Sequence, residues 1–99
     1  MPRVERTPAA DQDLQEIGYY IGVQQHRPST AEKILREIDA KCRTYAAQPF
    51  TGTARPDLGE RYRVFHHKRW VVIYRPIHDG IEILRVVDGA RDYPSLFQQ

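Results

Sequence analysis

The sequence predicts an α+β fold in which an N-terminal helical hairpin packs on one face of a small antiparallel sheet. Two observations carry this prediction. Apolar residues recur at helical spacing through the first half of the chain, with a break at Pro28, and the second half contains short runs rich in β-branched and aromatic residues. The 99 residues, 40% hydrophobic and 28% charged, fit one folded domain spanning residues 1–99.

The first predicted elements are a short strand over Arg3–Arg6 and a helix that begins at Thr7. Thr7 is placed to cap the helix, and Pro8 takes its first position. Gly18 and Gly22 lie beside the apolar face, which indicates close approach of a second helix. That face comprises Ala10, Leu14, Ile17 and Ile21.

A second helix is predicted after the break at Pro28. Ser29 and Glu32 have the spacing of a capping box, and Pro49 ends the helix. Its apolar stripe comprises Ile34, Leu35, Ile38, Cys42 and Tyr45. The short link between the two helices predicts an antiparallel hairpin.

Three strands are predicted after a loop over residues 49–60 that is rich in proline and glycine. They cover residues 61–66, 70–75 and 81–87. Because the connections are short, consecutive strands should pair in antiparallel fashion. Gly89 ends the last strand, and a short tail follows.

Composition limits the classes of function. The net charge is only +2, which does not by itself indicate a nucleic-acid-binding protein. The single cysteine, Cys42, cannot form an intrachain disulfide, as is typical of a reducing compartment. The sequence contains neither an apolar signal core nor the ~20 apolar residues needed to span a bilayer. We therefore expect a cytoplasmic protein without membrane contact.

Arginines and an aromatic residue are predicted on the open face of the sheet. If Tyr62 and Val64 face the helices, then Arg61, Arg63 and Phe65 face away from them. Such a face can bind RNA or an acidic protein surface. An open sheet face must also be polar in any case, so solvation alone explains the arginines equally well.

Other aromatic and histidine residues allow two interpretations. Tyr19 and Tyr20 lie off or at the edge of the first helix's apolar face, where exposed aromatics mark a partner site or are merely solvated. His66 and His67 point to opposite faces if the strand reaches them, which argues against a shared metal ion. Nucleophile and phosphate-loop motifs are absent from the sequence, so we expect no cofactor, no metal and no catalytic residue.

Several segments, taken in order, resemble the ParE/RelE toxin superfamily over nearly the whole chain. No single motif is diagnostic, but the ordered set is. Asp88 is a departure, because many relatives carry histidine there. The matching segments are Leu14–Ile17 with Tyr20, the loop residues Pro49, Gly52 and Arg55, the strand Val72–Arg75, and the final run Ile83–Asp92.

The resemblance implies one of two activities and a partner. RelE-like members cut messenger RNA on the ribosome, using basic residues on the second and third strands and an arginine and tyrosine near the C-terminus. ParE-like members lack that set and poison DNA gyrase. Both are neutralised by an antitoxin whose C-terminal segment folds onto the toxin.

Residue by residue, the resemblance favours the ParE-like activity. Arg63 matches the first basic position on the second strand, but Phe65 occupies the other, and Val71 stands where the third strand would carry arginine. Arg91 matches the C-terminal arginine, and Phe97 falls near the tyrosine position. The expected function is a type II toxin that inhibits gyrase without catalysis of its own. A RelE-like ribosome-dependent endoribonuclease is the alternative, and a harmless binding module is a third possibility.

The predicted partner sites follow from the same comparison. The antitoxin, expected to be ParD-like and to form a hetero-oligomer with this chain, should bind the hairpin at Tyr19 and Tyr20. DNA contact is expected only through the antitoxin. The residues predicted to contact the target are Arg61, Arg63, Phe65, Arg91, Asp92, Tyr93 and Phe97.

Overall fold

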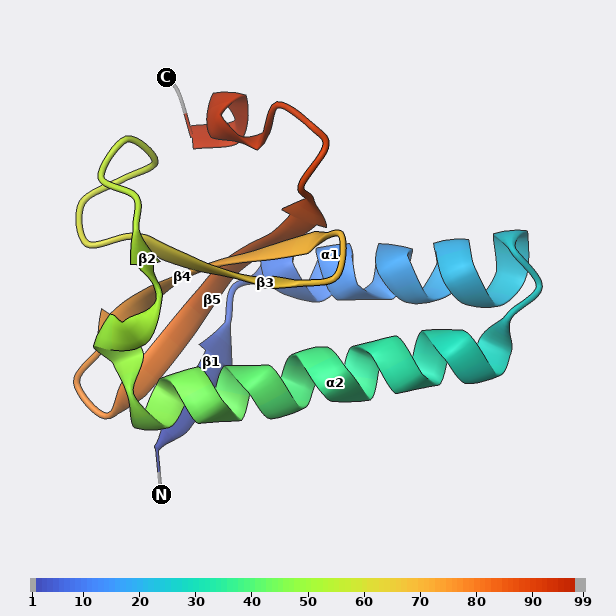
Figure 1. The fold of residues 1–99 in the computed structure, drawn as a ribbon, viewed down its shortest axis with the longest axis horizontal. Coiled ribbons are helices and arrows are strands. Elements are labelled where there is room, and N and C mark those ends of the chain that lie inside the picture. The colour runs from blue at the N-terminus through green and yellow to red at the C-terminus, as the bar shows by residue number, and fades with distance from the viewer. Residues whose placement is uncertain (1, 98–99) are drawn as a thin grey trace.

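A computed structural model describes residues 2–97 and places a helical hairpin on one face of a five-stranded sheet (Figure 1). The loop after β2 and the C-terminal tail lie on the opposite side of the sheet (Figure 1). This confirms the predicted α+β class. The strands are β1 (Arg3–Arg6), β2 (Thr53–Ala54), β3 (Arg63–His67), β4 (Trp70–Ile77) and β5 (Gly80–Asp88), in the spatial order β1-β5-β4-β3-β2.

The sheet is mixed rather than wholly antiparallel. Strands β2 to β5 pair in antiparallel order as consecutive neighbours, whereas β1 runs parallel to β5. Gly80 permits this parallel pairing, because a Cβ atom there would lie 1.9 Å from the carbonyl oxygen of Arg3. The two-residue strand β2 lies inside the segment that we predicted to be a loop.

Helix α1 (Pro8–Tyr19) begins as predicted. The Thr7 hydroxyl accepts a hydrogen bond from the Ala10 amide at 3.1 Å and donates one to the Leu84 carbonyl at 2.8 Å. One side chain therefore caps the helix and also ties its first turn to β5. The helix continues through one π-helical segment, η1 (Tyr20–Gln24), before the turn.

Helix α2 (Pro28–Ala47) begins two residues earlier than predicted, because a helix capped by Ser29 would start at Thr30. Arg27 is the N-cap and makes no side-chain capping bond, so the predicted capping role of Ser29 is wrong. Proline is favoured at the first helical position, and this places Ser29 already inside the helix. The close helix contact is confirmed, since a Cβ atom on Gly18 would lie 3.3 Å from the Leu35 Cδ1 atom.

Apolar side chains are buried on both faces of the sheet. The core under the helices, here called the helix-side core, includes Ile17, Ile34, Ile38, Phe65, Val72 and Tyr74. A smaller core, here called the tail-side core, lies on the opposite face. It comprises Leu58, Val64, Val71, Ile73 and Val87, with Tyr62, Leu84, Tyr93 and Phe97 packed against it.

The predicted orientation of β3 is wrong. Phe65 is only 3% exposed, and its ring stacks on Tyr45 of α2 with centroids 4.2 Å apart. Val64 points to the tail-side core instead. Alternation along a strand fixes which residues share a face, but it cannot identify the helix-covered face when both are apolar. Arg61 precedes β3 in a left-handed turn with φ of 67°.

Candidate partner-binding surfaces

A cleft of about 340 Å³ lies between the end of α1, the β3–β4 turn and the end of β5. We call it the Tyr20 cleft. The guanidinium carbon of Arg69 lies 6.0 Å from the Tyr20 ring centroid and 5.1 Å from that of Trp70. Cation–π contacts of this kind favour a fixed position for an exposed arginine. Trp70 is buried.

Asp88 stabilises the part of this cleft that is formed by the β3–β4 turn and the residues after β5. Its carboxylate pairs with Arg69 and accepts the Ala90 amide at 2.9 Å. The Ala90 amide, and next the Arg69 guanidinium, lower the pKa of Asp88 below its ordinary value. A neutral histidine has only one acceptor nitrogen, so it could not serve both donors. Asp88 therefore links the β3–β4 turn to the first residues of the tail.

A partly buried ion pair between Asp13 and Arg85 joins α1 to β5 beside the same cleft. The Asp13 carboxylate receives the Arg85 Nε and Nη2 atoms at 2.7 and 2.9 Å, and the Val86 amide at 2.9 Å. A register shift opposite Ile73 and Tyr74 accompanies the place where Arg85 turns towards the helix. Sequence reasoning missed this pair. The available signal was that Asp13 is an acid on the apolar stripe of α1.

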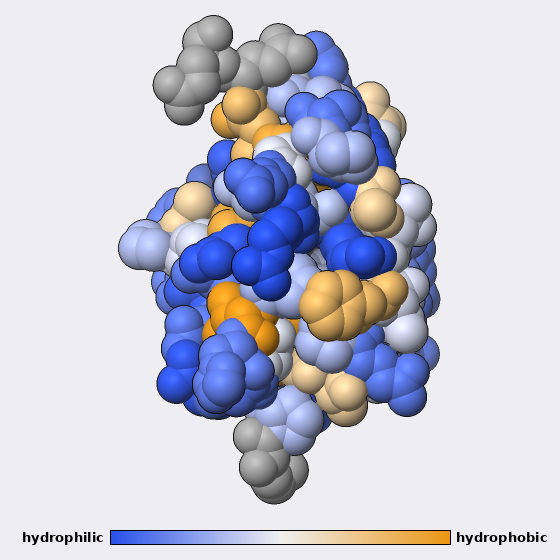
Figure 2. Space-filling model, turned by 90° about the vertical axis from the view of Figure 1, so that its left-hand side faces the viewer, coloured by the Kyte–Doolittle hydropathy of each residue, from blue (hydrophilic) through white to orange (hydrophobic). Residues whose placement is uncertain are grey.

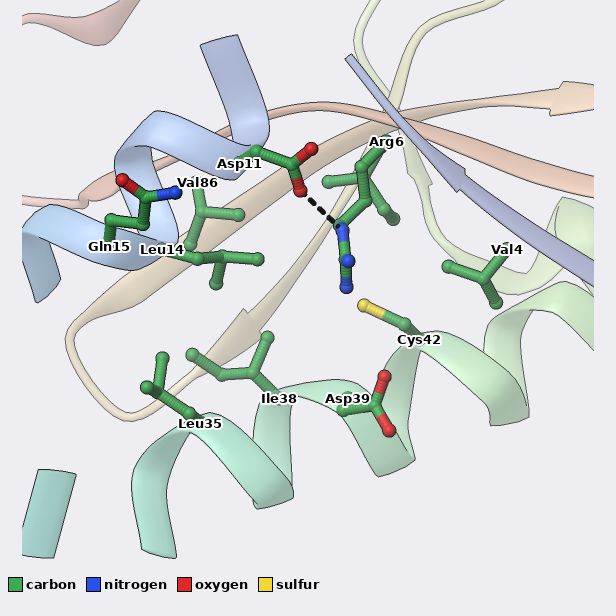
Figure 3. Close-up of a pocket in the computed structure, with 11 residues that line it drawn as sticks. Val4, Arg6, Asp11, Leu14, Gln15, Leu35, Ile38, Asp39, Cys42 and Val86 are labelled. Atoms are coloured by element: carbon green, nitrogen blue, oxygen red, sulfur yellow. Dashed lines mark hydrogen bonds and ion pairs between the residues drawn. The ribbon is translucent and has the colours of Figure 1, made fainter. Parts of the chain in front are cut away.

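An apolar groove of about 360 Å³ opens between β1, α1 and α2 (Figure 3). Apolar side chains from these elements, including Leu14 and Leu35, point into it, and the Arg6 side chain extends across it (Figure 3). The Arg6 Nε atom lies 2.6 Å from a carboxylate oxygen of Asp11. Cys42 also lines the groove, and burial raises the pKa of its thiol to about 12. Such a thiol is unreactive at neutral pH.

The tail packs on the sheet through its aromatic residues. In the 3-10 helix η3 (Tyr93–Phe97), Phe97 meets the Tyr62 ring edge-on with centroids 5.6 Å apart. The Tyr93 hydroxyl accepts a hydrogen bond from Arg55 Nη1 at 2.7 Å. Arg55 also forks around the Asp57 carboxylate, so one guanidinium joins the loop to the tail.

The arginines predicted on the open sheet face have different environments. Arg63 donates to the carbonyl oxygens of Phe50 and Gly52 at 3.0 and 2.7 Å, which fastens the chain before β2 to β3. Arg61 is exposed. Figure 2 shows the side of the molecule that carries β2 as a mixture of hydrophilic areas and smaller hydrophobic ones. Phe50, in the segment just before β2, is 66% exposed.

The structure brings some predicted site residues together and separates others. Tyr20 and Arg91 line the same cleft, although we assigned them to different partners. Tyr19 is adjacent and 57% exposed, as expected. Phe65 is buried, so it offers no surface to a target. Tyr93 and Phe97 pack against the tail-side core. Asp92 is exposed at the start of the tail.

His67 ends β3, one residue beyond the predicted strand over residues 61–66. It is 8% exposed, and its Nε2 atom lies 2.9 Å from the Glu37 carboxylate on α2. His66 is exposed, and the alternation of β3 directs it away from the helices, so the two histidines point to opposite faces. Across residues 2–97, no three metal-binding side chains gather, and no helix is long and apolar enough to cross a membrane.

These features define a small α+β protein whose notable surfaces are a polar cleft, an apolar groove and an anchored tail. The family model described as "ParE toxin of type II toxin-antitoxin system, parDE" matches residues 4–93. The curated Toxin ParE3 of Caulobacter vibrioides is 32% identical over 89 residues, which cover 90% of this chain and 88% of that protein. The chain therefore belongs to the ParE toxin family of type II toxin–antitoxin systems.

A solved structure supports the same fold. The structure described as "Chromosomal ParDE TA system from P. aeruginosa" matches with a TM-score of 0.69. The match covers 89% of this chain and 96% of the other, at 22% sequence identity. It therefore supports the arrangement of helices and strands described above.

Proposed function

We propose that this chain is a cytoplasmic toxin that inhibits DNA gyrase and is neutralised by a ParD-like antitoxin in a hetero-oligomer. Membership of the ParE family supports the toxin role and the existence of an antitoxin. The choice of gyrase rests on the side chains at the positions where an RNA-cleaving relative needs its chemistry.

One observation carries this choice: the relevant strand positions hold no available acid–base group. Phe65 and Val71 are 3% and 1% exposed, and Arg63 is bound to backbone carbonyls. Attack by a 2′-hydroxyl needs a base for that hydroxyl and an acid for the leaving oxygen. Arginine stays protonated and supplies neither. At the C-terminal end, Phe97 has no hydroxyl group.

The proposed contact surface for gyrase begins at the tail. Arg91 and Asp92 are exposed immediately after β5, and the packing of Tyr93 and Phe97 fixes where they project. Arg61 adds an exposed cation near the β2 edge of the sheet. Phe65 is no longer part of this proposal, because it is buried. The proposed antitoxin contacts are Tyr19 and Tyr20.

A DNA cleavage assay with gyrase tests the proposal. The purified toxin is incubated with DNA gyrase, ATP and plasmid DNA, and stalled cleavage complexes are counted after detergent treatment. We expect linear DNA to accumulate with the toxin and to disappear when antitoxin is added. A parallel reaction with ribosomes and messenger RNA is the matched comparison. Defined cuts in the messenger, with unaffected gyrase, would contradict the proposal.

A further inference from the structure

Charges around the Tyr20 cleft are compensated unevenly. Asp13 is bound by Arg85 at two points, and Asp88 is bound by Arg69. Two more charged residues line the cleft, Glu16 on α1 and Arg91 after β5. Both are exposed, and neither forms an ion pair with any residue from 2 to 97.

The cleft therefore has a polarity. Its α1 wall presents the carboxylate of Glu16, which accepts a hydrogen bond from Gln12 at 3.1 Å but forms no ion pair within residues 2–97, and its tail wall presents the guanidinium of Arg91. The same cleft is lined by Tyr20, which is 37% exposed, and by the apolar side chains of Ile17 and Trp70. Aromatic and arginine side chains beside a small apolar floor are typical of residues that dominate binding energies.

We propose that the Tyr20 cleft binds a segment of the antitoxin in one fixed direction. The segment carries a basic side chain where it faces Glu16 and an acidic side chain where it faces Arg91, with an apolar side chain between them. This inference rests on the proposed neutralisation by an antitoxin and adds the chemistry and direction of the bound segment. The argument is charge complementarity, since a segment of reversed polarity would place like charges against both walls.

Asp88 acts in this recognition as a positioning residue. It pairs directly with Arg69, which also lies against the rings of Tyr20 and Trp70, whereas Arg91 lowers the pKa of Asp88 only through its charge and forms no ion pair with it. It also accepts the Ala90 amide, which sets where the chain turns before Arg91. Replacing Asp88 by asparagine would leave Arg69 as a second cation without an ion pair. The cleft would then no longer present one unpaired anion opposite one unpaired cation.

The test measures binding of the antitoxin encoded beside the toxin gene to immobilised toxin variants. We expect Glu16→Lys and Arg91→Glu each to weaken binding about tenfold at low salt, and the double variant to weaken it more than either. The losses should shrink as salt is raised, because these charges are exposed and screened within about 10 Å at 0.1 M salt. Asp88→Asn should weaken binding and reduce its dependence on Arg91.

Controls come from α2. Glu32→Lys and Arg36→Glu reverse charges whose side chains are 76% and 73% exposed and do not line the cleft. These variants should bind as the wild type does, and circular dichroism checks that every variant is folded.

The outcomes separate the two proposals. Wild-type affinity in Glu16→Lys and Arg91→Glu, with a wild-type complex that forms normally, would overturn the polarity inference and leave neutralisation standing. Gyrase inhibition does not enter this decision, because Arg91 is also a proposed gyrase contact and its variant should lose inhibition in either case. Failure of the wild-type toxin to bind the antitoxin at all would overturn both proposals.

Discussion

Asp13 and Arg85 lie 72 residues apart in the sequence and form a two-point ion pair that joins the first helix to the last strand. The same carboxylate accepts the Val86 amide, so it also satisfies a backbone group beyond the end of β1. Asp13 is 7% exposed, which means that water cannot readily replace either partner.

The first prediction concerns this ion pair. Asp13→Asn should lower the free energy of unfolding by about 2–4 kcal/mol, because it leaves a half-buried guanidinium without its counter-charge. Urea unfolding followed by circular dichroism measures the loss. Asp11→Asn is the matched control on the same helix. Its partner Arg6 is about half exposed, so the cost should stay below about 1 kcal/mol. Equal losses in both variants would contradict the structural role of Asp13.

The second prediction concerns the Cys42 thiol. Burial raises its pKa to about 12, so at pH 8 only about 10⁻⁴ of the folded protein carries the reactive thiolate. Roughly a quarter of the unfolded chains carry it at that pH. Labelling with a chromogenic disulfide should therefore be slow and should follow unfolding as urea is added. Fast labelling of the folded protein in the absence of urea would contradict the burial.

The same thiol predicts a dependence of stability on pH. The pKa of Cys42 is higher in the folded than in the unfolded protein. The contribution of this thiol to the free energy of unfolding is therefore fully present below pH ~8.5 and is lost as pH rises towards the folded pKa. Between pH 8 and 10, the wild type should lose roughly 2 kcal/mol relative to Cys42→Ala, since only the wild type can ionise this thiol on unfolding. If the free energies of unfolding of the wild type and Cys42→Ala differ by the same amount at pH 8 and pH 10, this prediction is contradicted.

The third prediction separates two roles of the tail. Phe97→Ala should cost about 1–2 kcal/mol of stability, because its ring packs on Tyr62. Arg91→Ala should stay within about 0.5 kcal/mol of the wild type yet lose toxicity, since its side chain is exposed. Growth after induction and thermal unfolding are the two measurements. A protein truncated after Ala90 that is folded and fully toxic would exclude the tail as an effector.

The fourth prediction concerns the exposed aromatics of the hairpin. Tyr19→Glu and Tyr20→Glu should each weaken antitoxin binding at least about tenfold, because exposed aromatics at an interface contribute more than their number suggests. Phe50→Glu is the matched control, since Phe50 is 66% exposed but lies at the other end of α2. Titration calorimetry measures the affinities. If both tyrosine variants bind the antitoxin with wild-type affinity, the hairpin does not belong to the interface.

Much of the secondary structure could be predicted because its determinants are local. Thr7 and Pro8 mark the start of α1 within two residues of sequence, and the apolar spacing of α2 needs no knowledge of its partners. The strand β4 was equally evident, since every residue from Trp70 to Tyr74 is β-branched or aromatic. These signals do not depend on long-range contacts.

Apart from the capping role of Ser29, which failed for the local reason given above, the main features that sequence reasoning missed depend on distant contacts. Burial of Phe65 requires Tyr45 on another element, and the pairing of Asp13 with Arg85 requires a register shift in β5. The parallel direction of β1 is also set by a partner almost eighty residues away, at Gly80. Of the candidate site, exposure of Tyr19 was predictable, whereas the meeting of Tyr20 with Arg91 was not.

Coverage of the sheet by its own tail affects how quickly a partner can bind there. Val64 and Val71 are 2% and 1% exposed beneath the loop and η3. A protein that binds these strands from the tail side must take the place of Phe97 and Tyr93. Its association therefore requires that the tail opens first, and it is not a single bimolecular step. At high partner concentration, the observed rate would then level off at the rate of tail opening. The Arg55 bond to Tyr93 would set part of that limit.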